Sequence, residues 1–302
     1  MAAGTNLRET MDFDPSSPSN SVSVIIPVYN GAKFIAQTLD SILAQTVLPT
    51  EIIVVNDGST DESSPILREY GSSIILIETP NQGVCASRNL GASLATSNWL
   101  AFCDQDDLWL PTKLEAQLRL ANECPELDFI LTDFADVAEG IVGNRSHLSY
   151  APTGFWTPEQ HESGFVVRES VTGKLTVFQP CITSTPIIKS RLFHGVGGFD
   201  LEANRFTTED TCLHIRCLSS VPFGVIPKVL MHYRRHANQV STDNLKQLRN
   251  TVLVWDYIIA NYPQAQPYRS ELLQGLAAMR KEVSETARYQ RRQKLKSLLR
   301  VS

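Results

Sequence analysis

The sequence contains no apolar run long enough to cross a membrane. None of its hydrophobic stretches approaches the roughly 18 residues that a membrane-spanning helix requires. The first residues, MAAGTNLRETMDFDPSSPSNS, carry neither the basic start nor the apolar centre of a signal peptide. We therefore expect a cytoplasmic protein in which residues 1–21 form a flexible lead-in, because this segment is rich in Ser, Pro and Asn.

Cysteine pairs of the C-x-x-C type are also missing. The chain has six cysteines, most of them in apolar surroundings: Cys85, Cys103, Cys124, Cys181, Cys212 and Cys217. This pattern favours reduced, buried thiols over zinc ligands or disulfides, which stay open as alternatives.

Charged residues are scarce, at 20%, whereas 42% of the chain is hydrophobic, so the composition is that of a globular protein. Residues 280–302 hold eight Lys or Arg and two Glu, a net charge of +6, which leaves −11 for the rest of a chain whose total is −5. The apolar stripe before this basic end is formed by Leu272, Leu276, Met279 and Val283. The combination is typical either of a packing helix with a solvated end or of a helix that docks on an anionic inner membrane surface. An acidic body makes nucleic acid a poor partner.

Short β-rich runs alternate with helical patterns over the first 130 residues, which indicates a parallel sheet with crossover helices. The spacing predicts strands at 22–28, 51–55, 74–77, 99–103, 129–131 and 225–233, and helices at 33–44, 64–70, 83–95, 111–120, 209–219, 245–259 and 272–299. Residues 133–175 show no clear periodicity. We divide the chain into a flexible lead-in (1–21), a first half (22–130), a second half of the same domain (131–240) and a C-terminal helical extension with a basic tail (241–302).

Polar clusters follow each of the first four predicted strands. They are Pro27-Val28-Tyr29-Asn30, Asn56-Asp57-Gly58, Asn81-Gln82-Gly83 and Asp104-Gln105-Asp106-Asp107. Turns alone favour Asp, Asn and Gly, so a single loop of this kind carries little information. Open parallel sheets, however, bind ligands outside the carboxyl ends of their strands, and four such loops on one edge indicate a ligand site.

The fourth loop carries the sharpest chemical pattern. Asp104, Asp106 and Asp107 place three carboxylates within four residues, and each would raise the pKa of the others unless a cation sits among them. Mg²⁺ or Mn²⁺ prefers oxygen ligands and completes its shell with substrate phosphates. The alternative is a solvated acidic turn that caps the helix after Pro111.

These motifs together resemble family 2 glycosyltransferases, which have the GT-A fold, a Rossmann-like and mostly parallel sheet flanked by helices. The resemblance is strong over residues 22–120. It resumes at Gly197-Gly198-Phe199-Asp200, at Glu209-Asp210 and at YRRHANQVS, residues 233–241. It covers neither 133–175 nor the last sixty residues with any specificity. The resemblance implies that residues 22–130 form a nucleotide-sugar-binding half and residues 131–240 an acceptor-binding and catalytic half of the same domain.

The resemblance implies a base-binding pocket after the first two strands. Asp57 would read the base, typically uracil, and Gly58 would let the backbone come close to a flat ligand. Pro27, Tyr29 and Asn30 are assigned to the wall of the same pocket. For Asp57 the alternative is an ordinary Asp-Gly turn.

The family pattern further implies a metal and diphosphate site. Arg88 would approach the nucleotide or its phosphates, and Asp104 would hold the ribose or metal-bound water. Asp106 would bind Mn²⁺ or Mg²⁺, with Asp104 as a further ligand. His236 lies where this family often has a third metal ligand, although a lone His after a strand is often structural.

The Glu209-Asp210 pair resembles the acidic pair of the family at a helix start, and Asp210 is the better match to the catalytic base. A positioned carboxylate can accept the proton of an attacking hydroxyl. A helix N-terminus that favours acidic residues is the plain alternative.

The implied function is a metal-dependent inverting glycosyltransferase. It would move a sugar from a nucleotide donor, with UDP as the expected nucleotide, to a hydroxyl of a glycan or lipid-linked acceptor. The alternatives are a sugar-phosphate nucleotidyltransferase, a metal-dependent phosphatase and a non-catalytic module that binds sugar nucleotides. The first would need a Gly-rich basic loop after the first strand, where PVYNGAKF offers only Gly31 and Lys33. The second would need a nucleophilic acid at Val55.

Overall fold

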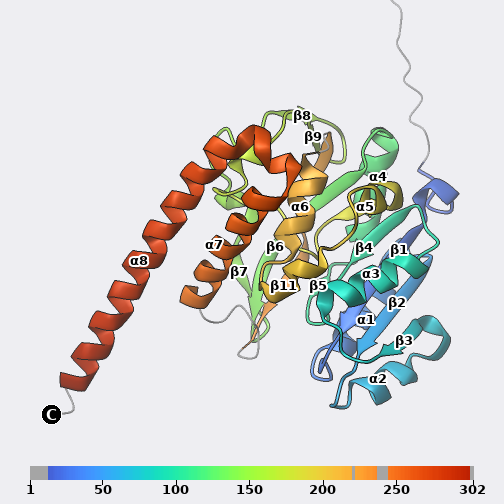
Figure 1. Ribbon diagram of the computed structural model, residues 1–302. Coiled ribbons are helices and arrows are strands. Elements are labelled where there is room, and N and C mark those ends of the chain that lie inside the picture. The colour runs from blue at the N-terminus through green and yellow to red at the C-terminus, as the bar shows by residue number, and fades with distance from the viewer. Residues whose placement is uncertain (1–12, 220–221, 237–243, 300–302) are drawn as a thin grey trace, which may run out of the picture.

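A computed structural model describes residues 13–219, 222–236 and 244–299. The described strands form one mixed sheet in the order β3-β2-β1-β4-β10-β6-β11-β9-β8, with β5 paired to β11 and β7 paired to β6. Helices cover both faces of the sheet, and a long C-terminal helix lies at the end away from β3 (Figure 1). The predicted fold class, a mostly parallel sheet with flanking helices and a C-terminal helical extension, is confirmed.

The strands of the sheet are β1 (Val22–Val28), β2 (Glu51–Asp57), β3 (Ile75–Thr79), β4 (Trp99–Phe102), β5 (Leu108–Trp109), β6 (Phe129–Ala138), β7 (Ile141–Ser146), β8 (Pro158–Gln160), β9 (Phe165–Val167), β10 (Ile187–Lys189) and β11 (Phe223–Arg235). The α-helices are α1 (Ile35–Leu43), α2 (Ser63–Glu69), α3 (Val84–Leu94), α4 (Lys113–Glu123), α5 (Ser190–Gly195), α6 (Asp210–Leu218), α7 (Asn244–Asn261) and α8 (Arg269–Leu299). The predicted elements differ from these mainly in their end residues.

The first four strands run parallel, as their apolar sequences predict. β1 pairs with both β2 and β4, and every residue of β1 is buried. A strand covered by helices on both faces needs apolar residues at successive positions rather than at alternate ones, and VSVIIPV and EIIVV meet this condition. The carboxyl ends of β1, β2, β3 and β4 therefore share one edge of the sheet.

The two faces of the sheet support separate hydrophobic cores. One core packs β-strand side chains such as Ile25 and Phe102 against α3, α5, α6 and α7, and the other packs Val24 and Ile26 against α1, α2 and α4. All six cysteines are buried and unpaired.

Residues 133–175 contain regular structure that the sequence did not indicate. The strand predicted at 129–131 continues as β6 to Ala138, and β7, β8 and β9 follow it. β7 is almost wholly exposed, and β8 and β9 have only three residues each. None of the three strands therefore has an alternation of apolar and polar residues long enough to be recognised in the sequence.

The C-terminal extension packs on the body through its apolar stripe. Leu272 and Leu276 of α8 are fully buried, and Met279 packs against the same core. Beyond this contact α8 runs past the body of the molecule (Figure 1). Among the described helices, none is long and apolar enough to span a bilayer.

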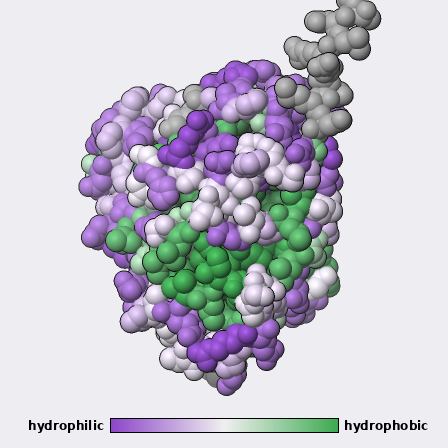
Figure 2. Space-filling view, turned by 90° about the vertical axis from the view of Figure 1, so that its right-hand side faces the viewer, coloured by the Kyte–Doolittle hydropathy of each residue, from purple (hydrophilic) through white to green (hydrophobic). Residues whose placement is uncertain are grey.

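The side of the molecule at β3 carries a broad apolar area (Figure 2). β3 ends the described sheet, and its Ile75 is 45% exposed. Leu94, at the end of the neighbouring α3, is also exposed.

Candidate active site

The loop after β1 is fastened to the acidic loop after β4 by one amide side chain. Gln105 accepts a hydrogen bond from the Tyr29 N–H at 2.9 Å and donates one to the Tyr29 carbonyl at 3.1 Å. A Cβ on Gly31 would stand 2.3 Å from Gln105 Oε1, so any larger residue at this position would displace the amide. Tyr29 itself is 48% exposed, whereas Pro27 is buried within β1.

The same loop is tied to the loop after β2. Asn30 has a positive φ of 50° and accepts a hydrogen bond from the Thr60 N–H at 2.8 Å. Asp61 accepts hydrogen bonds from Ser63 at the start of α2 and from the Ala32 N–H at 3.0 Å. Asp61 therefore holds both the start of α2 and the loop after β1.

Asp57 lies at the end of β2 and is 3% exposed. Its two carboxylate oxygens accept hydrogen bonds from the backbone N–H groups of Gln82 and Gly83, each at 2.8 Å. Gly58 has a φ of +74°, and a Cβ there would stand 2.8 Å from the backbone nitrogen of Asn81. Contacts with the loop after β3 are thus sufficient to account for an Asp at position 57 and a Gly at position 58, without a ligand.

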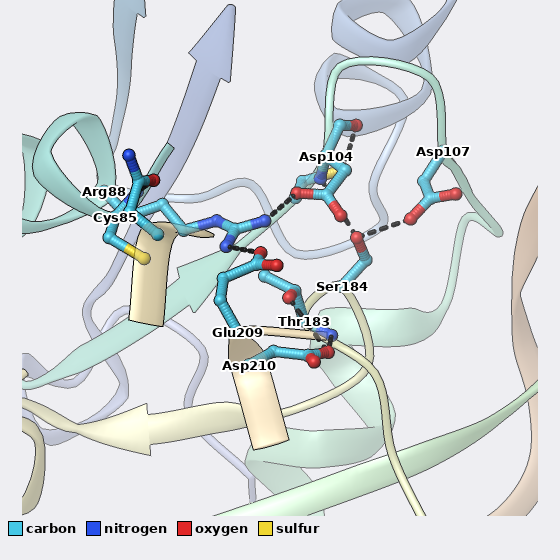
Figure 3. Close-up of polar contacts among 10 residues, drawn as sticks. Cys85, Arg88, Asp104, Asp107, Thr183, Ser184, Glu209 and Asp210 are labelled. Carbon is cyan, nitrogen blue, oxygen red and sulfur yellow. Dashed lines mark hydrogen bonds and ion pairs between the residues drawn. The ribbon is translucent and has the colours of Figure 1, made fainter. Parts of the chain in front are cut away.

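Arg88 connects the two halves of the sequence. From α3 its guanidinium donates to Asp104 Oδ1 and to Glu209 Oε1, at 2.6 Å each, and its side chain is only 3% exposed (Figure 3). It also lies over the Phe199 ring at 4.9 Å. Arg88 therefore holds the acidic loop after β4 against the start of α6.

A turn before β10 makes the second connection. Ser184 Oγ accepts from the Asp104 N–H at 3.0 Å and donates to Asp107 Oδ2 at 2.6 Å (Figure 3). Thr183 donates through both its N–H and its hydroxyl to Asp210 Oδ2, at 3.2 and 3.3 Å. Asp107 is fully buried, which fits a supporting carboxylate.

Burial governs the acid–base character of this cluster. Desolvation raises the pKa of Asp106 and, more strongly, of Asp107, and the neighbouring Asp104 charge adds to both shifts. Burial also raises the pKa of Glu209 and Asp210, although the Arg88 charge opposes it. These carboxyl groups hold protons more readily than exposed ones.

Asp106 and His236 form the pair that could hold a metal ion. His236 Nε2 lies 2.8 Å from Asp106 Oδ2, and both side chains are partly exposed, at 15% and 18%. Ligands about 2.1 Å from an octahedral ion lie about 3.0 Å apart, so these two donors stand at a suitable separation. One carboxylate oxygen and one imidazole nitrogen suit Mn²⁺.

Asp104 is 33% exposed, but its Oδ1 is paired with Arg88. The described residues contain no group of three or more His, Cys, Asp or Glu side chains arranged to hold a metal. Asp106 and His236 could therefore hold a metal only if its remaining ligands came from substrate phosphates or water.

The sequence did not predict the contacts that several residues make at this site. Gln105, Thr183 and Ser184 are ordinary polar residues whose partners lie far along the chain. The pairing of Asn89 with Phe199 was not predicted either. The Asn89 amide accepts a hydrogen bond from the Phe199 N–H at 2.8 Å and donates one to the Phe199 carbonyl at 2.7 Å. The sequence signal that could have indicated these contacts is the glycine at positions 31 and 198. A Cβ at Gly31 would clash with the Gln105 amide, and a Cβ at Gly198 would clash with the Asn89 amide.

Comparison with known proteins agrees with this arrangement. The family model described as "Glycosyl transferase family 2" matches residues 23–169. An uncharacterized glycosyltransferase of Rickettsia typhi is 33% identical over 236 residues, which cover 78% of this chain and 70% of that protein. A glycosyltransferase of Rickettsia felis is 27% identical, and the match spans 40% of its length.

Solved structures share the fold. A fragment of S. aureus TarS, residues 1–349 in complex with UDP-GlcNAc, has a TM-score of 0.61 and 20% identity, over 84% of this chain and 72% of the fragment. The match covers 42% of the longer TarS chain. A Pyrobaculum calidifontis mannosyltransferase in complex with GDP-Man and Mn²⁺ has a TM-score of 0.57 and 18% identity, over 90% of this chain and 77% of that one.

The sheet, its loop edge and these neighbours define an enzyme of the GT-A glycosyltransferase class. The chain belongs to glycosyl transferase family 2.

Proposed function

We propose that this enzyme is a metal-dependent inverting transferase that moves a sugar from a nucleotide donor, with UDP as the expected nucleotide, to a hydroxyl of a glycan or lipid-linked acceptor. The supporting observation is the meeting of Asp104 and Glu209 on the single guanidinium of Arg88, beside the Asp106–His236 pair. The acidic loop after β4 and the acidic pair at the start of α6, about a hundred residues apart in sequence, thereby lie at one edge of the sheet.

The nucleotide would lie over the loops after β1 and β2. Tyr29 and Asn30 are exposed there, and Asp57 holds the next loop through two backbone N–H groups. A carboxylate oxygen has a second lone pair, so Asp57 can also accept from the ring N–H of a base. The UDP-GlcNAc complex of TarS and the GDP-Man complex of the mannosyltransferase support a sugar-nucleotide donor without deciding the base.

Asp210 is the proposed base and Glu209 its supporting neighbour. Glu209 is paired with Arg88 at 2.6 Å, which stabilises its charged form and lowers its basicity. Asp210 accepts longer bonds from Thr183 and a backbone hydrogen bond from Thr211. Burial raises the pKa of both carboxyl groups, but Glu209 is the one paired directly with the guanidinium, so Asp210 is the better proton acceptor. A single base that removes the proton of the acceptor hydroxyl is what an inverting transfer needs.

Asp106 and His236 would hold Mn²⁺ or Mg²⁺, and Asp104 would hold metal-bound water. When bound, the ion neutralises charge that develops on the leaving diphosphate. The Mn²⁺ in the mannosyltransferase supports this proposal. Arg88, being buried in its carboxylate pairs, is assigned to position Asp104 and Glu209 rather than to contact the phosphates.

The exposed end of α8 is the proposed membrane contact. Arg288, Arg291 and Arg292 are exposed there, and the apolar stripe is already used for packing at Leu272 and Leu276. The contact would therefore be mainly electrostatic and sensitive to salt. Flotation with anionic and neutral vesicles, comparing the full chain with one that ends after Met279, tests it. Equal flotation of both chains rules out α8.

A donor screen that measures UDP or GDP release, with and without Mn²⁺, tests the proposed reaction. We expect Asp210→Asn to lower kcat by 10²- to 10⁴-fold while UDP binding stays near wild type. Asp106→Ala should remove the response to Mn²⁺. Turnover that survives chelation would refute the metal, and full turnover of Asp210→Asn would refute the base. Asp128→Asn, a surface carboxylate paired with Arg191, is the matched control.

A further inference from the structure

Phe34 lies at the start of α1, where the loop after β1 ends, and its ring faces the end of β11. The His236 imidazole packs against it in a tilted arrangement, with ring centroids 4.4 Å apart and an angle of 35° between the ring planes. The Arg234 guanidinium lies over the same ring, 4.7 Å from its centroid. One aromatic side chain from the first loop thus contacts two cationic or ionisable side chains from a segment two hundred residues later.

Both contacts have a physical reason to be favourable. The face of a phenyl ring carries partial negative charge, which attracts a guanidinium within about 6 Å. Arg234 is 9% exposed, and it lies close enough to Asp106 and Asp107 for their charges to act on it. Phe34 therefore gives Arg234 an apolar support that does not compete with these carboxylates for its N–H groups.

The contact also restricts the imidazole ring. His236 Nε2 reaches Asp106 Oδ2 at 2.8 Å, and this requires one orientation of the ring about its Cβ–Cγ bond. A ring packed against Phe34 at 4.4 Å cannot rotate freely about that bond without losing this contact. Groups that orient a metal-ligating His commonly change metal affinity 10- to 100-fold when they are removed.

We propose that Phe34 is a positioning residue that orients His236 toward Asp106 and holds Arg234 beside them for a metal-bound diphosphate. This inference rests on the proposed function, because it assigns Asp106 and His236 to the metal. It adds an aromatic side chain at the end of the loop after β1 to the residues that the metal site needs. The spacing of Asp, Glu and His residues in the sequence does not indicate this side chain.

The test compares Phe34→Leu, Phe34→Tyr and Phe13→Leu. Phe13→Leu is the matched control because the Arg119 guanidinium lies 4.7 Å from the Phe13 ring centroid, the same arrangement at another place. One readout is binding of Mn²⁺ in the presence of UDP, followed by the paramagnetic broadening of assigned His236 ring signals. The other is the chemical shift of these signals without metal, which reports the Phe34 ring current.

We expect Phe34→Leu to weaken Mn²⁺ binding about tenfold and to remove the ring-current shift of His236. Phe34→Tyr should restore both, and Phe13→Leu should change neither. Wild-type Mn²⁺ binding in a folded Phe34→Leu protein would overturn the proposal. If the wild-type protein itself binds no Mn²⁺, the metal assignment fails. The His236 shifts then decide the positioning role, and unchanged shifts in Phe34→Leu overturn it.

Discussion

Arg88→Met should destabilise the protein far more than the loss of an ordinary ion pair. The wild-type guanidinium is 3% exposed and pairs with Asp104 and Glu209 at 2.6 Å each. Methionine keeps most of the apolar length of the side chain but leaves both carboxylates without their counter-charge. Breaking a buried pair by removing one partner costs about 3–5 kcal/mol.

The structure places the expected loss near the lower end of that range. Asp104 is 33% exposed and can regain water, whereas Glu209 is 12% exposed and cannot do so fully. Arg88 lowers the pKa of Glu209 against the raising effect of burial. In Arg88→Met that opposition is gone, so the pKa of Glu209 in the folded protein rises further above its unfolded value than it does in the wild type. The destabilisation, about 3 kcal/mol at pH 7, should therefore shrink as pH falls toward 5.

Urea unfolding at pH 5 and pH 7 measures both quantities. Arg191→Met is the control, because Arg191 pairs with Asp128 at 2.6 Å but is 69% exposed, and its loss should cost less than about 1 kcal/mol. Neutralising both partners as well, with Asp104→Asn and Glu209→Gln, should recover most of the stability lost in Arg88→Met. The reasoning is refuted if Arg88→Met costs no more than Arg191→Met, or if the triple variant recovers nothing.

Three further perturbations follow from particular contacts. Burial lowers the pKa of Lys113 to about 7, so the unfolded chain binds more protons above that pH. The free energy of unfolding of the wild type, measured by urea titration relative to that of Lys113→Met, should then rise by about 2 kcal/mol between pH 7 and pH 9. A difference between the two proteins that does not change with pH would contradict this prediction. Gly31→Ala should displace the Gln105 amide. We expect a loss of about 1–2 kcal/mol that is not additive with Gln105→Ala, whereas additive losses would mean the two sites act separately. Tyr262→Phe removes the hydroxyl that donates to Asp200 at 2.5 Å, and faster hydrogen exchange in the C-terminal helices is the expected result. Unchanged exchange would show that this bond does not hold the extension.

The sequence predicted the first four strands and the helices between them well because their signals are local. β1 and β2 are continuous apolar runs bounded by turn residues, and α1 repeats its buried side chains at Ile35, Leu39 and Ile42. The parallel arrangement then follows from alternating strands and helices, and with it the gathering of the four loops on one edge.

What the sequence did not predict depends on contacts between distant segments. Gln105 pairs with a backbone 76 residues away, and Asn89 with one 110 residues away. An amide at such a position looks like any polar residue of a loop or helix. Phe34 is hidden for a related reason, because an aromatic residue at a helix start is expected to pack into the core.

Charge balance links the remaining features of the site. Five carboxyl groups meet two guanidinium groups at this edge: Asp104, Asp106, Asp107, Glu209 and Asp210 with Arg88 and Arg234. A diphosphate adds further negative charge, and two unit charges 5 Å apart repel by about 3 kcal/mol at an effective dielectric constant of 20. A divalent ion removes this repulsion only if Asp106 keeps its charge. Asp106→Asn should therefore shift UDP affinity in opposite directions, tighter than wild type without metal and weaker with Mn²⁺. Calorimetric titration in both conditions measures this, and a loss of affinity in both would mean that Asp106 acts through packing rather than through charge.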